Sequence, residues 1–176
     1  SRQWDGQVNS ARPLVMAFSH SAVPAGGLAQ QQKLGWEILQ NWHDNDPTPW
    51  PDTVATDPDR AFWSMCFAGM QLFINMSSPA HLNRKSRILG DHFLFIINPR
   101  ERFDLVAGDT PEGHRVRAAI RRRIKAYDGM DHAPELGRYQ AGEIEWWQYG
   151  LSDANAVRHD RCPFKPSRPC WAPSPP

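Results

Sequence analysis

Phe93-Leu94-Phe95-Ile96-Ile97 is the stretch of sequence that decides the fold of this chain. Five consecutive apolar residues are typical of a strand that is covered on both faces. The run ends at Asn98-Pro99-Arg100, where the proline has no backbone N–H to donate to a neighbouring strand. We therefore expect a central strand over residues 92–98.

The residues upstream of this strand predict a hairpin. The residues Met70, Leu72, Ile74 and Met76 alternate with Gln71, Phe73 and Asn75, which is the two-residue period of a strand. Ala68-Gly69 supplies a turn to a partner strand over residues 62–67. The run Leu14-Val15-Met16-Ala17-Phe18 adds a short buried strand, so we expect a largely antiparallel sheet of four strands.

Two helices are expected to pack on this sheet. Residues Leu34, Ile38, Leu39 and Trp42 recur at helical spacing, and three prolines from Pro47 onward require this first helix to end near Asn45. The Ser-, Ala-, Gly- and Gln-rich residues 19–33 before it read as a mobile connection.

The second helix opens at Thr110-Pro111-Glu112, which combines a capping residue, a proline at the first helical position and an early acid. Its apolar stripe is Val116, Ile120, Ile124 and Tyr127. The other face is interpreted as solvated and carries Arg115, Arg117, the arginine run 121–123 and Lys125. The pattern as a whole predicts a single α+β domain with a proline-rich C-terminal arm.

Composition excludes several classes of protein. The chain has 176 residues and a net charge of +1, so general attraction to nucleic acid or to an anionic membrane is not expected. The sequence contains neither an apolar run long enough to cross a membrane nor a signal peptide at its start. Three cysteines without disulfide-like spacing favour a reducing compartment, so we expect a cytoplasmic protein.

The segment Ser78-Pro79-Ala80-His81-Leu82-Asn83-Arg84-Lys85-Ser86-Arg87 carries the strongest functional signal. It places one histidine, a ligand for borderline metals, beside arginines that can grip carboxylates or phosphates. A solvated turn is the alternative interpretation. Eight Trp and eight Phe predict a large aromatic core or an aromatic pocket, and Glu145 lies among aromatic residues where its charged form is disfavoured.

Read in order, these segments resemble the YqcI/YcgG family of bacterial proteins over residues 34–164. The pieces that carry the resemblance are Trp36, His43-Asp44 to Asp46 and Trp50-Pro51; Asp57-Pro58, Trp63 and Cys66-Phe67-Ala68-Gly69; Phe73, Ser78-Pro79-Ala80-His81 and Arg84 to Ser86-Arg87; Asn98-Pro99-Arg100 and Phe103; Ile120-Arg121 and Tyr127-Asp128; Leu136-Gly137-Arg138-Tyr139; Glu145-Trp146 and Gln148-Tyr149; and Asp153, Asn155 and Cys162-Pro163-Phe164. Residues 1–33 form a poorly assigned N-terminal segment, and residues 165–176 form the proline-rich tail.

Characterised members that the chain resembles are haem-dependent N-hydroxylases, which oxidise a nitrogen of arginine or of a related guanidino compound in a biosynthetic pathway. The resemblance implies haem b as the cofactor and a redox partner as an electron source. We expect His81 to be the axial ligand of the iron. The cofactor-binding residues that we expect around it are Arg84, Arg87, Arg100, Trp50 and Phe73. The acids expected to pair with a cationic small-molecule substrate are Asp44, Asp46 and Glu145.

Several alternatives remain open at this point. His43 is the main rival ligand, and Cys162 or Cys66 as a thiolate would imply different oxygen chemistry. The remaining histidines are weaker candidates: His20, His92, His114, His132 and His159. The protein is alternatively a non-catalytic haem or small-molecule binder, or a non-haem metal oxygenase built on His43, Asp46 and another histidine. The exposed arm and aromatic surface favour a homodimer.

Overall fold

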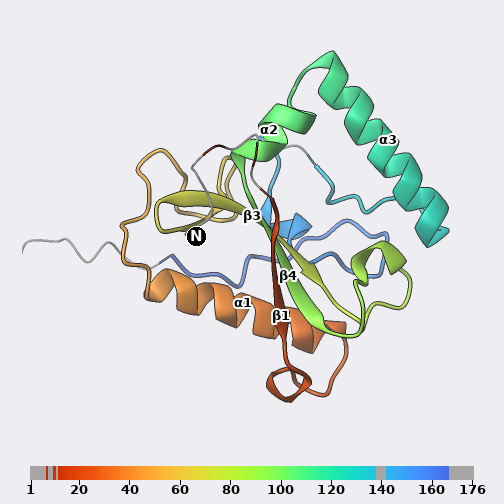
Figure 1. The fold of residues 1–176 in the computed structure, drawn as a ribbon, viewed down its shortest axis with the longest axis horizontal. Helices are drawn as coiled ribbons and strands as arrows, with labels where there is room; N and C mark the ends of the chain where they lie inside the picture. Colours follow the sequence, from red (N-terminus) through yellow and green to blue (C-terminus); the bar gives the residue numbers. More distant parts are fainter. Residues whose placement is uncertain (1–6, 8–9, 11, 138–141, 167–176) are drawn as a thin grey trace, which may run out of the picture.

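A four-stranded antiparallel sheet forms the centre of the protein (Figure 1). The computed structural model describes residues 7, 10, 12–137 and 142–166. The strand order is β1-β4-β3-β2. The strands are β1 (Leu14–Phe18), β2 (Met65–Phe67), β3 (Met70–Ser77) and β4 (Phe93–Pro99). This arrangement confirms the expected α+β domain, with the apolar run 93–97 in an interior strand.

Strand pairing follows from the sequence pattern. β4 pairs with β1 from Phe18↔Phe93 to Leu14↔Ile97, and with β3 from Ser77↔Leu94 to Leu72↔Pro99. The tight turn between β2 and β3 uses Ala68 at φ 51° and Gly69 at φ 76°, which is the geometry of a two-residue hairpin turn. The predicted turn is therefore confirmed. The first hairpin strand is shorter than expected, because Phe62 adopts a left-handed φ of 63° before it.

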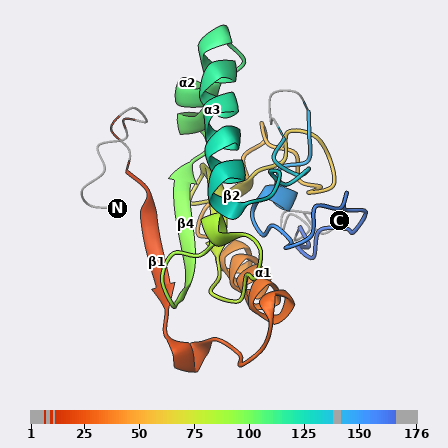
Figure 2. The same ribbon diagram turned by 90° about the vertical axis from the view of Figure 1, so that its right-hand side faces the viewer.

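One face of the sheet packs against helix α1 (Leu28–Asp44) and holds the hydrophobic core. Figure 2 shows α1 beside the strands, where Trp36 and Leu39 contribute to the core. Gly35 permits this close approach, since a Cβ built there would lie 2.7 Å from Met76 Sδ. The strand residues that enter the core alternate along the chain: Met65, Ile74, Met76, Phe93, Phe95 and Ile97.

The start of α1 corrects the prediction. Residues 28–33 were expected to be part of a mobile connection, but they form the first turns of the helix. Their glutamines are used in tertiary contacts: Gln31 Oε1 accepts a hydrogen bond from Ser78 Oγ, and Gln32 Nε2 donates to the Leu151 carbonyl. The polar composition of residues 28–33 resembles that of a loop. These residues nevertheless form a helix whose glutamine side chains hydrogen-bond to distant parts of the chain.

The second predicted helix is confirmed as α3 (Pro111–Asp128), with Thr110 as its cap. A short helix that the sequence did not predict, α2 (Glu101–Ala107), follows β4 and leads into α3. α3 contacts α2 and the single turn η2 (Lys85–Arg87). Two residues of the expected apolar stripe remain largely exposed, Ile120 at 46% and Tyr127 at 64%. α3 therefore covers the sheet less closely than α1 does.

The segment from residue 142 onward covers the part of the β3 edge that β2 does not pair with. The turn η4 (Trp146–Gln148) precedes Tyr149, whose carbonyl accepts a hydrogen bond from Met76 N. Phe164, just before the expected proline-rich tail, is buried in the core, and residues 167–176 of that tail lie outside the described part. Among the described residues, no helix is both long and apolar enough to cross a bilayer. The cytoplasmic location and the homodimer stay predictions.

Candidate functional site

A cavity of about 370 Å³ lies over the second face of the sheet, beneath α2 and α3. This volume is in the usual range of small-molecule sites. The sheet contributes side chains that alternate with those of the core, Phe73 and Asn75 from β3 with Ile96 and Asn98 from β4. The other described lining residues are Ser86, Arg87, Arg100, Phe103, Asp104, Ala107, Arg117, Ile120, Arg121, Ile124, Leu136, Gly137, Glu145 and Gln148.

A buried ion pair forms one wall of this cavity. Arg100, directly after β4, donates from Nε to Glu145 Oε2 at 2.7 Å, and both side chains are almost completely buried. The other carboxylate oxygen accepts hydrogen bonds of 2.8 Å from Ser64 Oγ and from Tyr149 Oη. Arg100 also donates to Asp104 Oδ1 at 2.9 Å. Glu145 is thus a fixed anchor for Arg100 rather than a loosely held acid.

The surroundings of this ion pair raise the pKa of both groups. Burial raises the pKa of Glu145, and Arg100 with the two hydroxyl donors opposes this rise. Burial disfavours the charge of Arg100, but the carboxylates of Glu145 and Asp104 outweigh it and raise the pKa of Arg100. Removal of Arg100 would leave the buried Glu145 without its charged partner, whereas removal of Glu145 would leave Arg100 with Asp104 alone.

Arg87 presents a second buried cation to the cavity. Its side chain lines the cavity, and its Nη1 has no hydrogen-bond partner among the described residues. Burial, together with the neighbouring Arg84, lowers the pKa of Arg87 to about 10, so the guanidinium is still protonated at neutral pH. A buried donor without a partner is costly, which makes Arg87 a natural contact for an anionic ligand group.

His81 lies on the loop between β3 and η2, and Arg87 is the last residue of η2. Its Nδ1 is 2.9 Å from Asp153 Oδ1, and its buried Nε2 has no partner among the described residues. Burial lowers the pKa of His81 despite the contact with Asp153, so the neutral imidazole is favoured. A neutral histidine held through Nδ1 with a vacant Nε2 has the form of a metal ligand. His81 does not line the 370 Å³ cavity.

Asp153 fixes the loop around His81 through the backbone as well. It accepts hydrogen bonds from the backbone N–H of Leu82 at 2.9 Å and from those of Asn83 and Arg84 at 3.3 Å. Arg84 is buried and donates to the Ser152 carbonyl and to Asn155 Oδ1. The Arg84 side chain therefore holds the C-terminal segment, and it does not line the cavity.

The remaining predicted residues lie on the α1 side of the molecule. Trp50 and His43 pack edge to face, with ring centroids 5.3 Å apart, and both contact Phe164. Asp44 accepts a hydrogen bond from Gln40. Asp46 accepts hydrogen bonds from the backbone of Thr48 and Ala68. None of the four predicted residues in this group lines the cavity.

The structure therefore brings together Phe73, Arg87, Arg100 and Glu145 from the predicted set. The sequence interpretation missed Arg117 and Arg121, which were grouped with the solvated face of α3 but line the cavity. Their four-residue spacing, one turn apart on the helix, was a usable signal. Both described cysteines are poor thiolate ligands, because burial raises the pKa of Cys66 and of Cys162 to about 12.

The YqcI/YcgG family model matches residues 2–165. This chain belongs to the YqcI/YcgG family. One relative, from Streptomyces lavendulae, is named "Putative N(omega)-hydroxy-L-arginine synthase DcsA"; it is 57% identical over 164 residues, which cover 93% of this chain and 62% of that protein. Two Bacillus subtilis (strain 168) relatives, the uncharacterized proteins YqcI and YcgG, are 36% and 34% identical over 76% of this chain.

The chain spans 62% of the length of the Streptomyces relative and 52% of each Bacillus relative. The matched region includes most of residues 1–33, the N-terminal segment that the sequence pattern leaves poorly assigned. No solved structure shows significant similarity to this chain. The family relationship is thus established by sequence.

Proposed function

We propose that this protein hydroxylates a guanidine nitrogen of arginine or of a related guanidino compound. The observation that carries the proposal is the 57% identity, over 93% of the chain, to the Streptomyces protein named as an N(omega)-hydroxy-L-arginine synthase. The cavity over the second face of the sheet is the proposed substrate site. Its volume suits an amino acid, and its wall combines apolar side chains with fixed charges.

The charges of the cavity suit a ligand that carries a carboxylate, which both arginine and haem do. Arg87 offers an unpartnered buried donor to a carboxylate. Glu145 is the predicted partner of the guanidinium, but its oxygens already accept hydrogen bonds from Arg100, Ser64 and Tyr149. Its role in the proposal is therefore to hold Arg100 in the cavity wall. Asp44 and Asp46 lie away from the cavity and are not included in the proposal.

Haem b is the proposed cofactor. The residues present fit a flat apolar group that carries carboxylates, since Phe73, Phe103 and Ile96 offer apolar contact. Arg87 and Arg100 would pair with the carboxylates. His81, whose buried Nε2 has no partner among the described residues, would coordinate the iron, with Asp153 as the acceptor that orients the ring. Because His81 does not line the cavity, this assignment requires the haem to extend beyond it. When bound, the haem would supply the oxygen chemistry, and the protein would orient the substrate and exclude water.

The reaction inserts one oxygen atom into an N–H bond of the guanidine group. With dioxygen as the oxidant, the second oxygen atom leaves as water and takes up two protons and two electrons from an external donor, the role of the proposed redox partner. With a peroxide as the oxidant, the peroxide is itself reduced and no external electrons are needed.

Two alternatives to this proposal differ from it in turnover or in the residues that they use. A non-catalytic haem or small-molecule binder would keep the cavity and lack turnover. A non-haem oxygenase on His43 and Asp46 has less support, because neither belongs to a three-ligand cluster among the described residues. His43 packs against aromatic rings instead.

The proposed function is tested by turnover of the haem-loaded protein with arginine, supplied with a reductant under air or with hydrogen peroxide. We expect a product that is heavier than arginine by one oxygen atom. The Arg87→Gln variant is expected to lose most of this turnover, and Arg115→Gln, which removes an exposed cation of α3, should retain it. Haem binding without oxidation of any guanidino compound would support the binder instead. A folded protein that takes up no haem and gives no product would overturn the proposal.

A further inference from the structure

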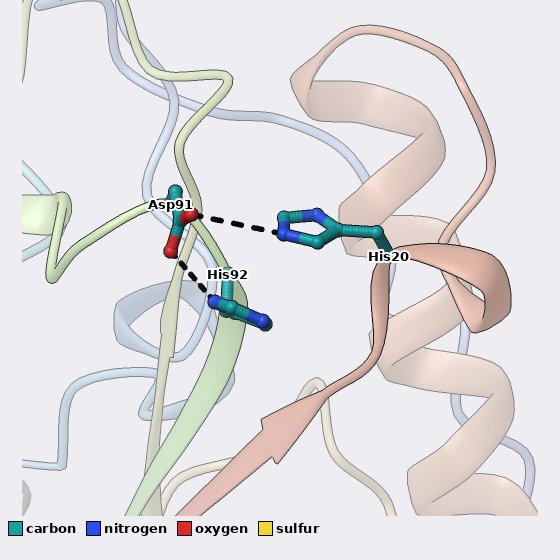
Figure 3. A group of neighbouring side chains, drawn as sticks. All are labelled: His20, Asp91 and His92. Atoms are coloured by element: carbon teal, nitrogen blue, oxygen red, sulfur yellow. Dashed lines mark hydrogen bonds and ion pairs between the residues drawn. The ribbon is translucent and has the colours of Figure 1, made fainter.

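A pair of histidines and a carboxylate meet at the end of the sheet that lies away from the cavity (Figure 3). The β1–β4 ladder ends at the pair Phe18↔Phe93. His20 lies two residues beyond β1, in the short turn η1 (His20–Ala22), and Asp91 with His92 immediately precedes β4. The antiparallel pairing therefore brings these three side chains together from two separate parts of the chain.

The geometry is close to that of a metal-binding triad. Asp91 Oδ1 is 2.7 Å from His92 Nδ1, and Asp91 Oδ2 is 3.7 Å from His20 Nε2. The three ligand atoms all lie within 4.8 Å of one another. Zinc–ligand bonds of about 2.0–2.2 Å in a tetrahedral arrangement place neighbouring ligand atoms roughly 3.4 Å apart. Small side-chain rotations would bring the triad to this spacing.

We propose that His20, Asp91 and His92 form a binding site for a divalent transition-metal ion of the zinc type. Two imidazoles and one carboxylate are donors that such ions prefer, whereas Mg²⁺ and Ca²⁺ prefer sites made of oxygen ligands. His20 and Asp91 are exposed and His92 is half-buried, so an ion can enter from solvent and complete its coordination with water.

An ordinary surface ion pair is the competing explanation, and the protein contains one that can serve as a control. His114 Nε2 lies 2.6 Å from Asp109 Oδ1, a histidine–carboxylate contact like that of His92 with Asp91, and both of its side chains are exposed. Arg117 Nη2 is 3.9 Å from the same Asp109 oxygen. This second pair has one imidazole and a neighbouring cation, which would repel a metal ion. A histidine–carboxylate contact alone is thus present at both places, but two imidazoles meet one carboxylate only at the proposed site.

The proposed site has a structural consequence that is separate from the proposed function. β1 is an edge strand and pairs only with β4, so a metal bound between His20 and His92 would join the ends of these two strands. A ligand that binds the folded state alone stabilises it as its concentration rises above the dissociation constant. The cavity residue Arg100 follows the other end of β4, eight residues after His92, or roughly 26 Å along an extended strand.

The test is a calorimetric titration of Zn²⁺ into untagged, metal-free protein, with Mg²⁺ as the hard-cation control. We expect one zinc site that His20→Ala and His92→Ala each weaken by at least about tenfold, since even loss of a residue that supports a ligand costs roughly 10–100-fold. His114→Ala should leave this affinity unchanged. Zinc should also raise the melting temperature of the wild type more than that of His20→Ala.

Two results would overturn the proposal. One is the absence of zinc binding by the folded wild-type protein at millimolar zinc. The other is a zinc affinity that is equal in the wild type, His20→Ala and His92→Ala. Because His20 and Asp91 are exposed, the variants are expected to fold, and Asp91→Asn provides a third variant that keeps the side-chain shape.

Discussion

The two faces of the sheet are built from neighbouring residues but have different chemistry. The face toward α1 receives Phe95 and Ile97, which are buried among aromatic side chains. The face toward α3 receives Ile96 and Asn98, which line a cavity with several arginines. One strand thus contributes to stability on one side and to a ligand site on the other. Alternation along β4 thus separates the two roles residue by residue.

The largest expected effect comes from truncation on the core face. Phe95→Ala removes a fully buried ring and should lower the free energy of unfolding by about 3–5 kcal/mol. Ile96→Ala, at the next position, should cost about 1 kcal/mol, because the half-buried side chain already borders a cavity. Urea unfolding of the two variants measures the difference. Equal losses would contradict the division between the faces.

The next largest effect concerns the ion pair in the cavity wall. Glu145→Ala leaves the buried Arg100 without its main partner, and breaking such pairs costs about 3–5 kcal/mol; the remaining contact with Asp104 favours the lower end. Asp160→Ala breaks the more exposed pair with Arg158 and should cost below about 1 kcal/mol. Chemical denaturation compares the two. A Glu145→Ala variant as stable as Asp160→Ala would show that the pair is not a structural anchor.

A smaller effect is expected at the start of α3, the helix that borders the cavity. Thr110 Oγ1 accepts a hydrogen bond from Gly113 N at 3.0 Å, and loss of such a cap costs about 1 kcal/mol. Thr110→Ala should therefore lower the melting temperature modestly, and Thr110→Ser should restore it. If the serine variant melted at the same temperature as the alanine variant, the hydroxyl would not be the capping group.

The smallest expected effect is a pH dependence at His81, because burial and Asp153 act in opposite directions on it. The pKa of His81 in the folded protein is lowered from its ordinary value of 6.5, so the unfolded chain takes up a proton first as the pH falls. The stabilising contribution is complete above pH 6.5 and is lost as the pH falls toward the lowered value.

Urea midpoints measured on both sides of this pH, in the wild type and in His81→Gln, would report this contribution. The wild type should lose more stability on acidification than the variant does. Asp153 titrates in a lower range, since hydrogen bonds from Leu82 N and His81 lower its pKa from 3.8 in spite of burial. Parallel curves for the two proteins would contradict the assignment to His81.

Sequence patterns predicted the sheet well because its signals are local. The period-two pattern of residues 70–76, the apolar run 93–97 and the Ala68-Gly69 turn each appear within a few residues. The first turns of α1 were missed because Gln31 and Gln32 are polar, and their partners, Ser78 and Leu151, are distant in the chain. α2 was not expected at all.

The candidate site was only partly predictable for the same reason. Arg87, Arg100 and Glu145 were predicted to lie in a site, but no local pattern shows that Arg100 and Glu145 form a buried pair across 45 positions. Arg121 was interpreted as solvated because its cavity partners come from other elements. His20 and His92 were considered singly, since their contact depends on the register of β1 against β4.

The central claim is that the second face of the sheet holds the ligand site, and a titration with hemin followed at the Soret band tests it most directly. We expect the wild type to take up one haem per chain. Arg87→Gln should bind about 10- to 100-fold more weakly, because hydrogen bonds to charged groups contribute about 1.5–3 kcal/mol. Arg115→Gln, with the same loss of charge outside the cavity, should match the wild type. No uptake, or equal affinity in all three proteins, would contradict the claim.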